Sequence, residues 1–337
     1  MKEKKAPGSL VYVNDHSEGI YRTGEKENFY YTDKNGKKVT DKSTIERIEK
    51  LVIPPDWKNV WICKNPQGHI QATGRDSKGR KQYIYHDKWV EYLSRQKYEN
   101  LIEFGERLPD IRKQLAKDLR RKKWDKKKVV ALAIKLMDEL YLRVGNKLYQ
   151  EENGTYGLTT LRKKHLTDEK KQLLLKYQAK NGKLRQVKIN HPTLQKLVKK
   201  CSELPGYELF RYKSGQKYIP INSQDINEYM NETIGGKITA KTFRTWGGTV
   251  LTIKFTPEAY KICKENPRKK LETTLIRLVA KELNNTVATA RKYYIHPEVL
   301  NHAIQGKVEK FKHKPNDPRL KWYDSEELIV LNMLRYK

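Results

Sequence analysis

Cysteine is scarce in this chain, and the three residues present, Cys63, Cys201 and Cys263, stand far apart. They form no C-x-x-C pair, so the sequence offers neither a disulfide framework nor a cysteine-based metal site. This usage is typical of proteins in a reducing compartment. The sequence also lacks an HExxH motif and an Asp-x-Asp pair, so it gives no sign of zinc-dependent hydrolysis or of a magnesium site built from carboxylates.

Long apolar runs are absent as well, and no uncharged stretch is long enough to predict a transmembrane helix. The N-terminus, Met-Lys-Glu-Lys-Lys, is not followed by an apolar core, so we predict no secretory signal. Residues 74–81 superficially resemble a Walker A loop. Arg80 and Lys81 stand where that loop requires Lys followed by Ser or Thr, so we do not expect ATP to be used.

Acidic residues are too few to balance the basic ones. Lys and Arg number 71 against 40 Asp and Glu, which gives a formal net charge of +31. This excess is larger than solubility requires, and it predicts a polyanionic partner. The 21 tyrosines interleaved with this basic surface favour nucleic acid over a bare membrane surface.

The order of the sequence patterns predicts an α+β protein with two domains. Residues 1–86 are predicted to form a small, mostly antiparallel β domain, with a hairpin signal at 29–37, a helix at 43–51 and strands at 60–63, 69–74 and 81–85. Residues 87–337 are predicted to form a larger, mainly helical domain with β-hairpins. Its clearest signals are a helix at 129–148, an extended segment at 155–166 and a hairpin at 173–189 that turns at Asn181-Gly182.

Two stretches have the composition of a DNA-binding surface. Tyr83 and Tyr85 fall on one face of the predicted strand 81–85, beside Arg75, Arg80 and Lys81. They could stack on bases, or they could form the core face of the sheet, and the pattern favours neither. The basic run at 117–128 suits a DNA backbone, although most such runs are solvated helix faces.

A pair of tyrosines near the C-terminus supplies a candidate nucleophile. One predicted helix ends at Asn284-Asn285, and a second opens at Thr286 and carries Tyr293 and Tyr294 before Pro297 stops it. A phenol, with an ordinary pKa of about 10, is a poor nucleophile at neutral pH. It becomes useful when cations lie near the oxyanion and the target is a phosphodiester.

The candidate cations lie far back in the sequence. Lys180 stands beside the predicted hairpin turn, and Arg244 lies near the start of a helix that opens at Thr239. Arg143 stands close to the Gly145-Asn146 interruption. Taken singly, each is better explained as an ordinary surface residue.

The order and context of these residues resemble the type IB DNA topoisomerases, in particular the small poxvirus-like and bacterial members. In the second predicted domain the matching stretches are Leu142-Arg-Val-Gly-Asn146, Gly157-Leu-Thr-Thr-Leu161, Ala179-Lys-Asn-Gly182, Thr239-Ala-Lys-Thr-Phe-Arg-Thr-Trp246, Asn285-Thr286 and Tyr294-Ile-His-Pro297. In the first they are Ile53-Pro-Pro-Asp-Trp57, Trp61-Ile-Cys63, residues 69–76 and residues 79–85.

The resemblance implies a role for each of these residues. Tyr294 would be the nucleophile, with Tyr293 only a neighbour. Arg143, Lys180 and Arg244 fall on the family's two arginines and its hairpin lysine. Asn285 stands where poxvirus and eukaryotic members have histidine and bacterial members have asparagine. The family's DNA contacts fall on Gln82, Tyr83, Tyr85, Tyr149 and Lys241.

The resemblance also implies that the two domains clamp double-stranded DNA and that a monomer relaxes supercoils through a 3′-phosphotyrosyl intermediate. It implies no metal, nucleotide or other cofactor. The expected setting is a bacterial nucleoid and cytoplasm, or the virion or host DNA compartment of a virus.

Two alternatives stay open. A tyrosine recombinase or integrase shares the nucleophile and the arginine pair, but usually has histidine where this chain has Lys241. A non-catalytic DNA-binding protein would need only the basic surface.

Overall fold

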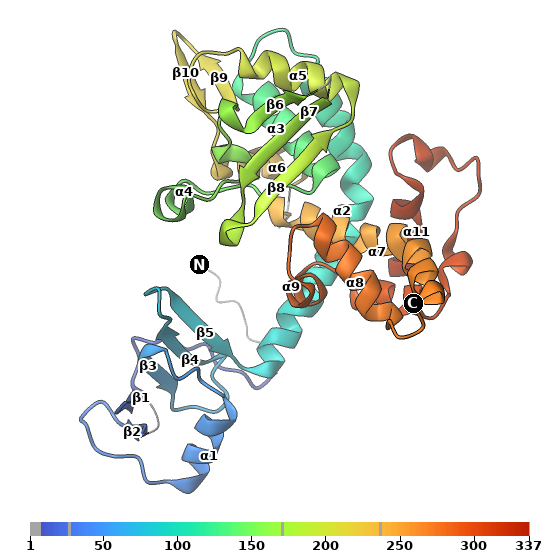
Figure 1. Ribbon diagram of the computed structural model, residues 1–337. Coiled ribbons are helices and arrows are strands. Elements are labelled where there is room, and N and C mark those ends of the chain that lie inside the picture. Colours follow the sequence, from blue (N-terminus) through green and yellow to red (C-terminus); the bar gives the residue numbers. More distant parts are fainter. Residues whose placement is uncertain (1–7, 26–27, 170–171, 236–237, 337) are drawn as a thin grey trace. The chain divides into compact units, whose positions relative to one another are not determined.

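The structure, a computed structural model, describes residues 8–25, 28–169, 172–235 and 238–336, without the side chains of Tyr149 and Ile234. The charged N-terminus at residues 1–5 therefore lies outside the described residues. The chain divides into two compact units, Met1–Tyr98 and Glu99–Lys337, and each is described by itself (Figure 1). The sequence puts the domain boundary at residue 86, directly before helix α2 (Asp87–Leu119). That boundary stays a prediction.

The first unit is an antiparallel sheet with one short helix, as the sequence predicts. Its strand order is β2-β1-β3-β4-β5, and every described pair is antiparallel. Ile20, Val60, Ile62 and Ala72 from the sheet pack with Ile48 from the helix to form its core. The elements are β1 (Gly19–Thr23), β2 (Tyr30–Thr32), α1 (Lys42–Lys50), β3 (Lys58–Cys63), β4 (Ile70–Arg75) and β5 (Lys81–Tyr85).

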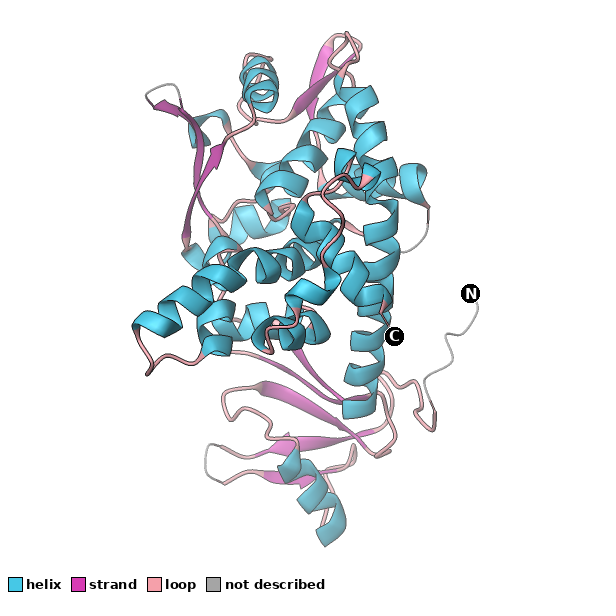
Figure 2. Cartoon of the chain, turned by 90° about the vertical axis from the view of Figure 1, so that its right-hand side faces the viewer, coloured by secondary structure: helices cyan, strands magenta, loops and turns pink. Residues whose placement is uncertain are grey.

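The second unit is mainly helical, and Figure 2 shows the contrast with the strand-rich first unit. Its helices after α2 are α3 (Lys126–Leu140), α4 (Lys147–Asn153), α5 (Pro192–Ser202), α6 (Ser223–Ile234), α7 (Ala240–Glu265), α8 (Leu271–Glu282), α9 (Val287–Tyr293), α10 (Pro297–Ile304) and α11 (Ser325–Arg335). Its strands are β6 (Leu166–Glu169), β7 (Gln172–Gln178) and β8 (Leu184–Ile189) in one sheet, and β9 (Arg211–Ser214) and β10 (Lys217–Pro220) in another. Over the described residues, no helix is both long and apolar enough to cross a membrane.

The predicted helix at 129–148 is wrong in its second half. Helix α3 ends at Leu140, because Tyr141 adopts the left-handed conformation with φ 53° and closes the helix. Gly145, at φ 99°, then reverses the chain before α4 begins at Lys147. Arg143 therefore lies in an irregular segment between two helices, where its side chain is not tied to a helix face.

The predicted extended segment at 155–166 is wrong, whereas the predicted hairpin at 173–189 is right. The segment at 155–166 is not extended, because it forms two 3-10 turns at Leu158–Thr160 and Lys163–His165. The hairpin is confirmed. Strands β7 and β8 pair in antiparallel register, and Asn181 and Gly182, in the three-residue turn Lys180–Gly182, both have positive φ.

Helix α7 runs through the centre of the second unit. From Phe243 to Ile253 every residue is buried, so the helix has no solvent face there. Gly247 and Gly248 allow close packing at this point, since a Cβ on Gly247 would lie 2.2 Å from the ring of Tyr141. This buried stretch includes Arg244, which is 4% exposed.

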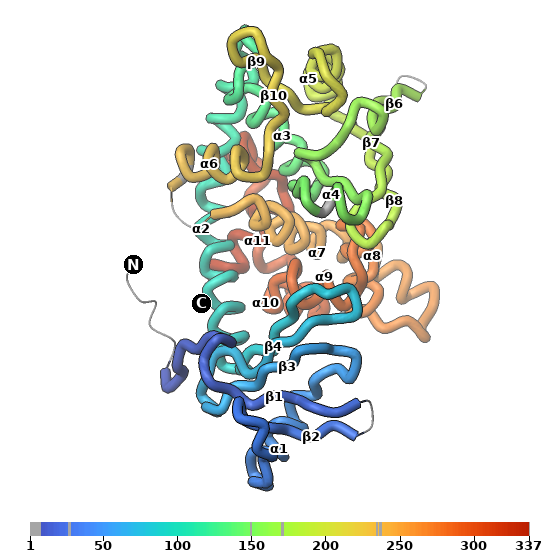
Figure 3. Tube along the Cα trace, turned by 90° about the vertical axis from the view of Figure 1, so that its left-hand side faces the viewer, coloured from blue at the N-terminus to red at the C-terminus, as the bar shows by residue number. Residues whose placement is uncertain are grey.

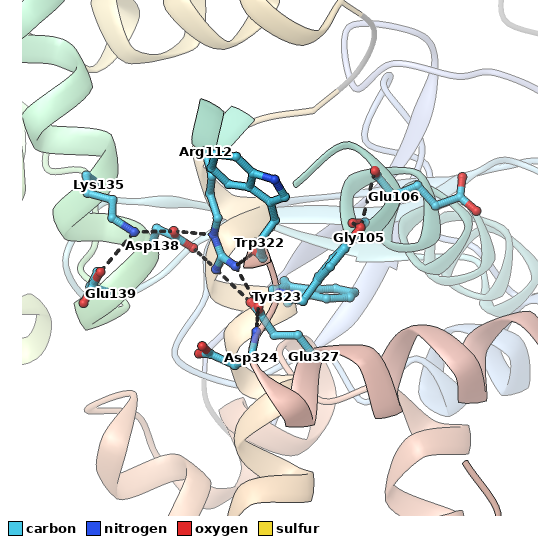
Figure 4. Close-up of polar contacts among 11 residues, drawn as sticks. Gly105, Glu106, Arg112, Lys135, Asp138, Glu139, Trp322, Tyr323, Asp324 and Glu327 are labelled. Atoms are coloured by element: carbon cyan, nitrogen blue, oxygen red, sulfur yellow. Dashed lines mark hydrogen bonds and ion pairs between the residues drawn. The ribbon is translucent and has the colours of Figure 1, made fainter. Parts of the chain in front are cut away.

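A buried charge network joins the helices around α7 (Figure 4). Arg112 of α2 donates to Asp138 of α3 at 2.9 Å and to Glu327 of α11 at 2.7 Å. Trp246 of α7 donates to the other oxygen of Glu327 at 3.0 Å. Burial alone would raise the pKa of Asp138, but the Arg112 guanidinium holds that pKa below its ordinary value. The network therefore fixes α7 to three neighbouring helices.

We expect Arg112→Met to lower the free energy of unfolding by about 3–5 kcal/mol, because buried Glu327 loses its ion-pair partner and buried Asp138 keeps only Lys135 at 3.4 Å. The pKa of Asp138, which Arg112 holds low, would then rise, so the deficit should be smaller at pH 5 than at pH 7. Urea denaturation followed by tryptophan fluorescence measures both effects.

Arg335→Met is the matched control. It breaks the ion pair between Arg335 of α11 and Glu106 of α2. These side chains are 48% and 43% exposed, so the free energy of unfolding should fall by less than about 1 kcal/mol. An equal loss in the two variants would contradict the prediction.

Candidate active site

Three arginines meet at the C-terminal ends of α3 and α8. Arg143 follows α3, Arg185 comes from β8 and Arg244 comes from the second turn of α7. Each guanidinium donates to main-chain carbonyl groups at these two helix ends. The acceptors are Asn284 O for Arg143 at 3.2 Å, Leu140 O at 3.2 Å and Glu282 O for Arg185, and Leu283 O at 2.9 Å and Tyr141 O for Arg244.

Helix C-termini explain how three positive charges can lie together. The free carbonyl groups and the macrodipole make each such end partly negative, which stabilises cations. Burial lowers the pKa of all three arginines, and burial with the nearby charge of Arg143 lowers that of Arg244 to about 10. All three stay protonated at neutral pH. Among the ion pairs within the described residues, none involves any of these three arginines, so the positive charge of the cluster is left for an anion.

Tyr294 lies against this arginine cluster. It is the residue that ends α9, and its ring centroid is 5.1 Å from the Arg244 guanidinium carbon. Tyr293 is the last residue of the helix and is 45% exposed, with Lys241 and Lys292 near its ring. The geometry thus separates two neighbours that spacing alone could not, and it puts only Tyr294 beside a buried guanidinium.

The main chain of Tyr294 is held by α7. A Cβ on Gly248 would lie 2.5 Å from the Tyr294 carbonyl oxygen, so only glycine allows this approach. The Thr249 hydroxyl lies 3.5 Å from the same oxygen and accepts from the amide of His296 at 3.2 Å. The helix that carries Arg244 therefore also positions the segment that carries the phenol.

Asn285 contacts Arg143 through its side-chain oxygen, which accepts from the guanidinium. Its amide nitrogen is buried and has no protein partner among the described residues. The same is true of the neighbouring Asn284, whose left-handed main chain (φ 51°) suits asparagine. A buried amide without a protein partner can donate to a bound molecule, and a phosphate oxygen is an acceptor that fits.

Arg143, Asn284, Asn285 and Tyr294 line one cavity of about 350 Å³, entirely within the second unit. Figures 1 and 3 show the turn of the β7–β8 hairpin next to α8 and α9, and that turn brings Lys180 to the cavity. Lys241 of α7 also lines it. The lining holds no acidic side chain and consists of Arg143, Lys180, Asn181, Lys183, Lys241, Asn284, Asn285, Thr286, Thr289, Tyr293 and Tyr294.

Three of the other predicted DNA contacts, Gln82, Tyr83 and Tyr85, belong to the first unit. Tyr83 and Tyr85 are 42% and 38% exposed, and their rings stack with centroids 5.8 Å apart, so the alternative of a core face is wrong. Gln82 donates to Asp76 at 2.9 Å. Tyr149 belongs to α4, but its side chain lies outside the described part of the chain. The first unit thus carries an exposed aromatic pair of the kind that can stack on bases.

The sequence interpretation missed four residues around the cavity. Arg185, Asn284 and the glycine pair Gly247-Gly248 hold or extend the site. Only the glycine doublet inside a helical pattern gave a signal, because glycine there usually has a packing reason. The other two act through residues distant in sequence.

An uncompensated guanidinium cluster beside a phenol, with a cavity lined by cations, defines a class of protein that binds nucleic acid through its phosphates. Two family models match the chain. The model of the eukaryotic DNA topoisomerase I catalytic core covers residues 87–319, and that of the bacterial DNA topoisomerase IB N-terminal domain covers residues 28–76.

Full-length relatives agree with these models. The DNA topoisomerase 1B of Acanthamoeba polyphaga mimivirus is 34% identical over 326 residues, which are 92% of this chain and 95% of that protein. The DNA topoisomerase 1B of vaccinia virus (strain Copenhagen) is 22% identical over 269 residues, 77% of this chain and 82% of that protein. The chain belongs to the type IB DNA topoisomerases, enzymes that change the topology of DNA. The resemblance seen in the sequence is confirmed.

Proposed function

We propose that this enzyme relaxes supercoiled DNA by cutting and resealing one strand through Tyr294. The phenolic oxygen attacks a backbone phosphorus in line, a 3′-phosphotyrosyl bond forms, and the bond from phosphorus to the 5′-oxygen breaks. The free strand end rotates. The 5′-hydroxyl then attacks the phosphotyrosyl phosphorus, which restores the phosphodiester and releases the phenol.

Charge stabilisation falls to the cations of the site. Arg143 and Arg244 would stabilise the two non-bridging oxygens, and Asn285 would donate its buried amide N–H to one of them. Lys180, on the hairpin turn at the cavity, would give a proton to the departing 5′-oxygen. Side-chain cations can in this way take the role of a metal. The phosphotyrosyl bond conserves the energy of the broken linkage, so no ATP is needed.

The observation that carries this proposal is the buried guanidinium of Arg244 at 5.1 Å from the Tyr294 ring, in a cluster with no carboxylate partner among the described residues. The DNA would also be gripped by side chains beyond the arginine cluster, one of which, Lys241, lies on the cavity wall. We assign that role to Gln82, Tyr83, Tyr85, Tyr149 and Lys241, and we propose a monomer acting on duplex DNA. The setting is a compartment that holds DNA, whether of a cell or of a virus.

Trapping on a nicked suicide substrate tests reaction, polarity and nucleophile together. The short fragment that carries the new 5′-hydroxyl dissociates after cleavage, so the enzyme should remain joined to the 3′ end of the other fragment, and the DNA-linked peptide should contain Tyr294. Plasmid relaxation without any recombination site should accompany it. Site-specific strand exchange without general relaxation would favour a recombinase, and salt-sensitive binding without covalent capture would favour a purely DNA-binding role.

A further inference from the structure

Arg185 is the third member of the arginine cluster, and like Arg244 it lies outside the cavity lining. It belongs to β8, is 8% exposed and pairs in register with the buried Tyr177 of β7. Its guanidinium donates to Leu140 O, at the end of α3, and to Glu282 O, at the end of α8. Both arginines thus donate to main-chain carbonyl groups, but of the two only Arg244 has its guanidinium against the Tyr294 ring in the described part of the chain.

Arg185 lies close to the turn of the β7–β8 hairpin, which carries Lys180. The last ladder pair before the turn is Gln178 with Leu184, and beyond it Ala179 donates to Lys183 O at 2.8 Å. Lys180 then projects from the turn itself and is exposed. Arg185, one residue past that last pair, is bonded to the same two helix ends that hold Arg143 and Arg244. Close to its turn, the hairpin is thus bonded to the same ends of α3 and α8 that hold Arg143 and Arg244.

We propose that Arg185 is a positioning residue that sets Lys180 relative to the arginines at the scissile phosphate. The inference depends on the proposed role of Lys180 as the proton donor. The geometry calls for arginine, because a planar guanidinium reaches carbonyl groups on two helices at once, whereas an ammonium is a point charge on a flexible stem. Loss of the bridge leaves the proton donor misplaced, and small misplacements are costly in catalysis.

Two DNA substrates separate this role from a general one. The first has the normal phosphodiester, and the second has sulfur in place of the bridging 5′-oxygen at the cleavage site. A thiol has an ordinary pKa of about 8.5, so a thiolate leaves without being protonated, whereas an alkoxide requires a proton donor. A defect in proton donation is therefore repaired by the sulfur substrate, and a defect in stabilising the non-bridging oxygens is not.

Single-turnover cleavage is measured for Lys180→Ala, Arg185→Met and Arg185→Lys. We expect Arg185→Met to cut the normal substrate on the order of 10²-fold more slowly than the wild type, as Lys180→Ala does, and both to cut the sulfur substrate at nearly the wild-type rate. On the normal substrate, the cleavage rate of Arg185→Lys should lie between those of the wild type and Arg185→Met. Arg211→Met is the control for lost packing, since Arg211 also donates to a carbonyl group, that of Tyr218, but away from the cavity. It should cleave both substrates normally.

The outcomes are distinct. Rescue of Lys180→Ala but not of Arg185→Met overturns the positioning role of Arg185 and leaves the proposed function standing. Failure of Lys180→Ala itself to be rescued removes the proton-donor role on which the inference depends, while covalent capture at Tyr294 still tests the rest. If thermal melting shows that the methionine variant is unfolded, Arg185→Lys is interpreted by the same rule.

Discussion

Replacing Tyr294 by phenylalanine is expected to abolish covalent capture of DNA and plasmid relaxation. Loss of the phenolic oxygen removes the atom that attacks phosphorus, so the cleavage rate should fall on the order of 10⁴-fold or more. DNA binding should persist, because neither the Arg143–Arg244 cluster nor the lysines that line the cavity depend on that oxygen for their position. The Kd should change by less than about tenfold, the worth of one hydrogen bond. Denaturing gels measure the capture, and filter binding at several salt concentrations measures the affinity.

Tyr293→Phe is the matched control, since it removes the same atom from the adjacent residue. Tyr293 lies on the cavity wall but is exposed, and the cations near its ring are lysines at 5.5 and 6.0 Å. We expect it to keep relaxation within about tenfold of the wild type, again the scale of one lost hydrogen bond. If the Tyr294 variant still formed a covalent complex and the Tyr293 variant did not, the nucleophile would be Tyr293.

Local signals in the sequence were enough for the parts of the fold that local chemistry decides. Asn181-Gly182 predicts a turn because both residues tolerate positive φ, and the structure has both there. The alternating strands of the first unit and the helical periodicity after Asp87 are confirmed for the same reason. The hairpin that carries Lys180 therefore follows from local sequence chemistry alone.

Tertiary contacts decided the parts that the sequence could not predict. The predicted helix at 129–148 breaks at Tyr141 because a left-handed tyrosine costs free energy that only its surroundings can offset. Its ring covers Gly247, and its carbonyl oxygen accepts from Arg244. Both partners lie on α7, far along the chain. No periodicity within residues 129–148 contains that information.

The site shows the same limit more sharply. Arg143 contacts Asn284 across 141 residues of sequence, and the acceptors of the arginine cluster are main-chain carbonyl groups, which have no sequence signature. The family resemblance could identify Arg143 and Arg244 as site residues. It could not show which groups hold their side chains in place. The ends of α3 and α8 supply those groups and neutralise part of the charge, while no carboxylate of the described segments forms an ion pair with the cluster.

Replacing Arg244 by lysine is expected to lower the single-turnover cleavage rate by about 10²–10³-fold at saturating DNA, although the positive charge is nominally kept. The guanidinium bonds to Leu283 O at 2.9 Å and to Tyr141 O while facing the Tyr294 ring, and an ammonium cannot make all three contacts. Because Arg244 itself is proposed to act on a non-bridging oxygen, a bridging sulfur at the 5′ position should not restore the rate. Rescue by sulfur would instead assign Arg244 to proton donation.

The pH dependence of this variant tests the electrostatic role directly. At a site 4% exposed and close to Arg143, the pKa of an introduced ammonium is lowered, so its charge is present only below that pKa and is lost as pH rises. The rate of Arg244→Lys relative to wild type should therefore be higher at pH 6 than at pH 9. Arg244→Met, which has no charge at any pH, is the control and should show the same relative rate at both. Equal pH profiles for the two variants would mean that shape, and not charge, makes Arg244 necessary.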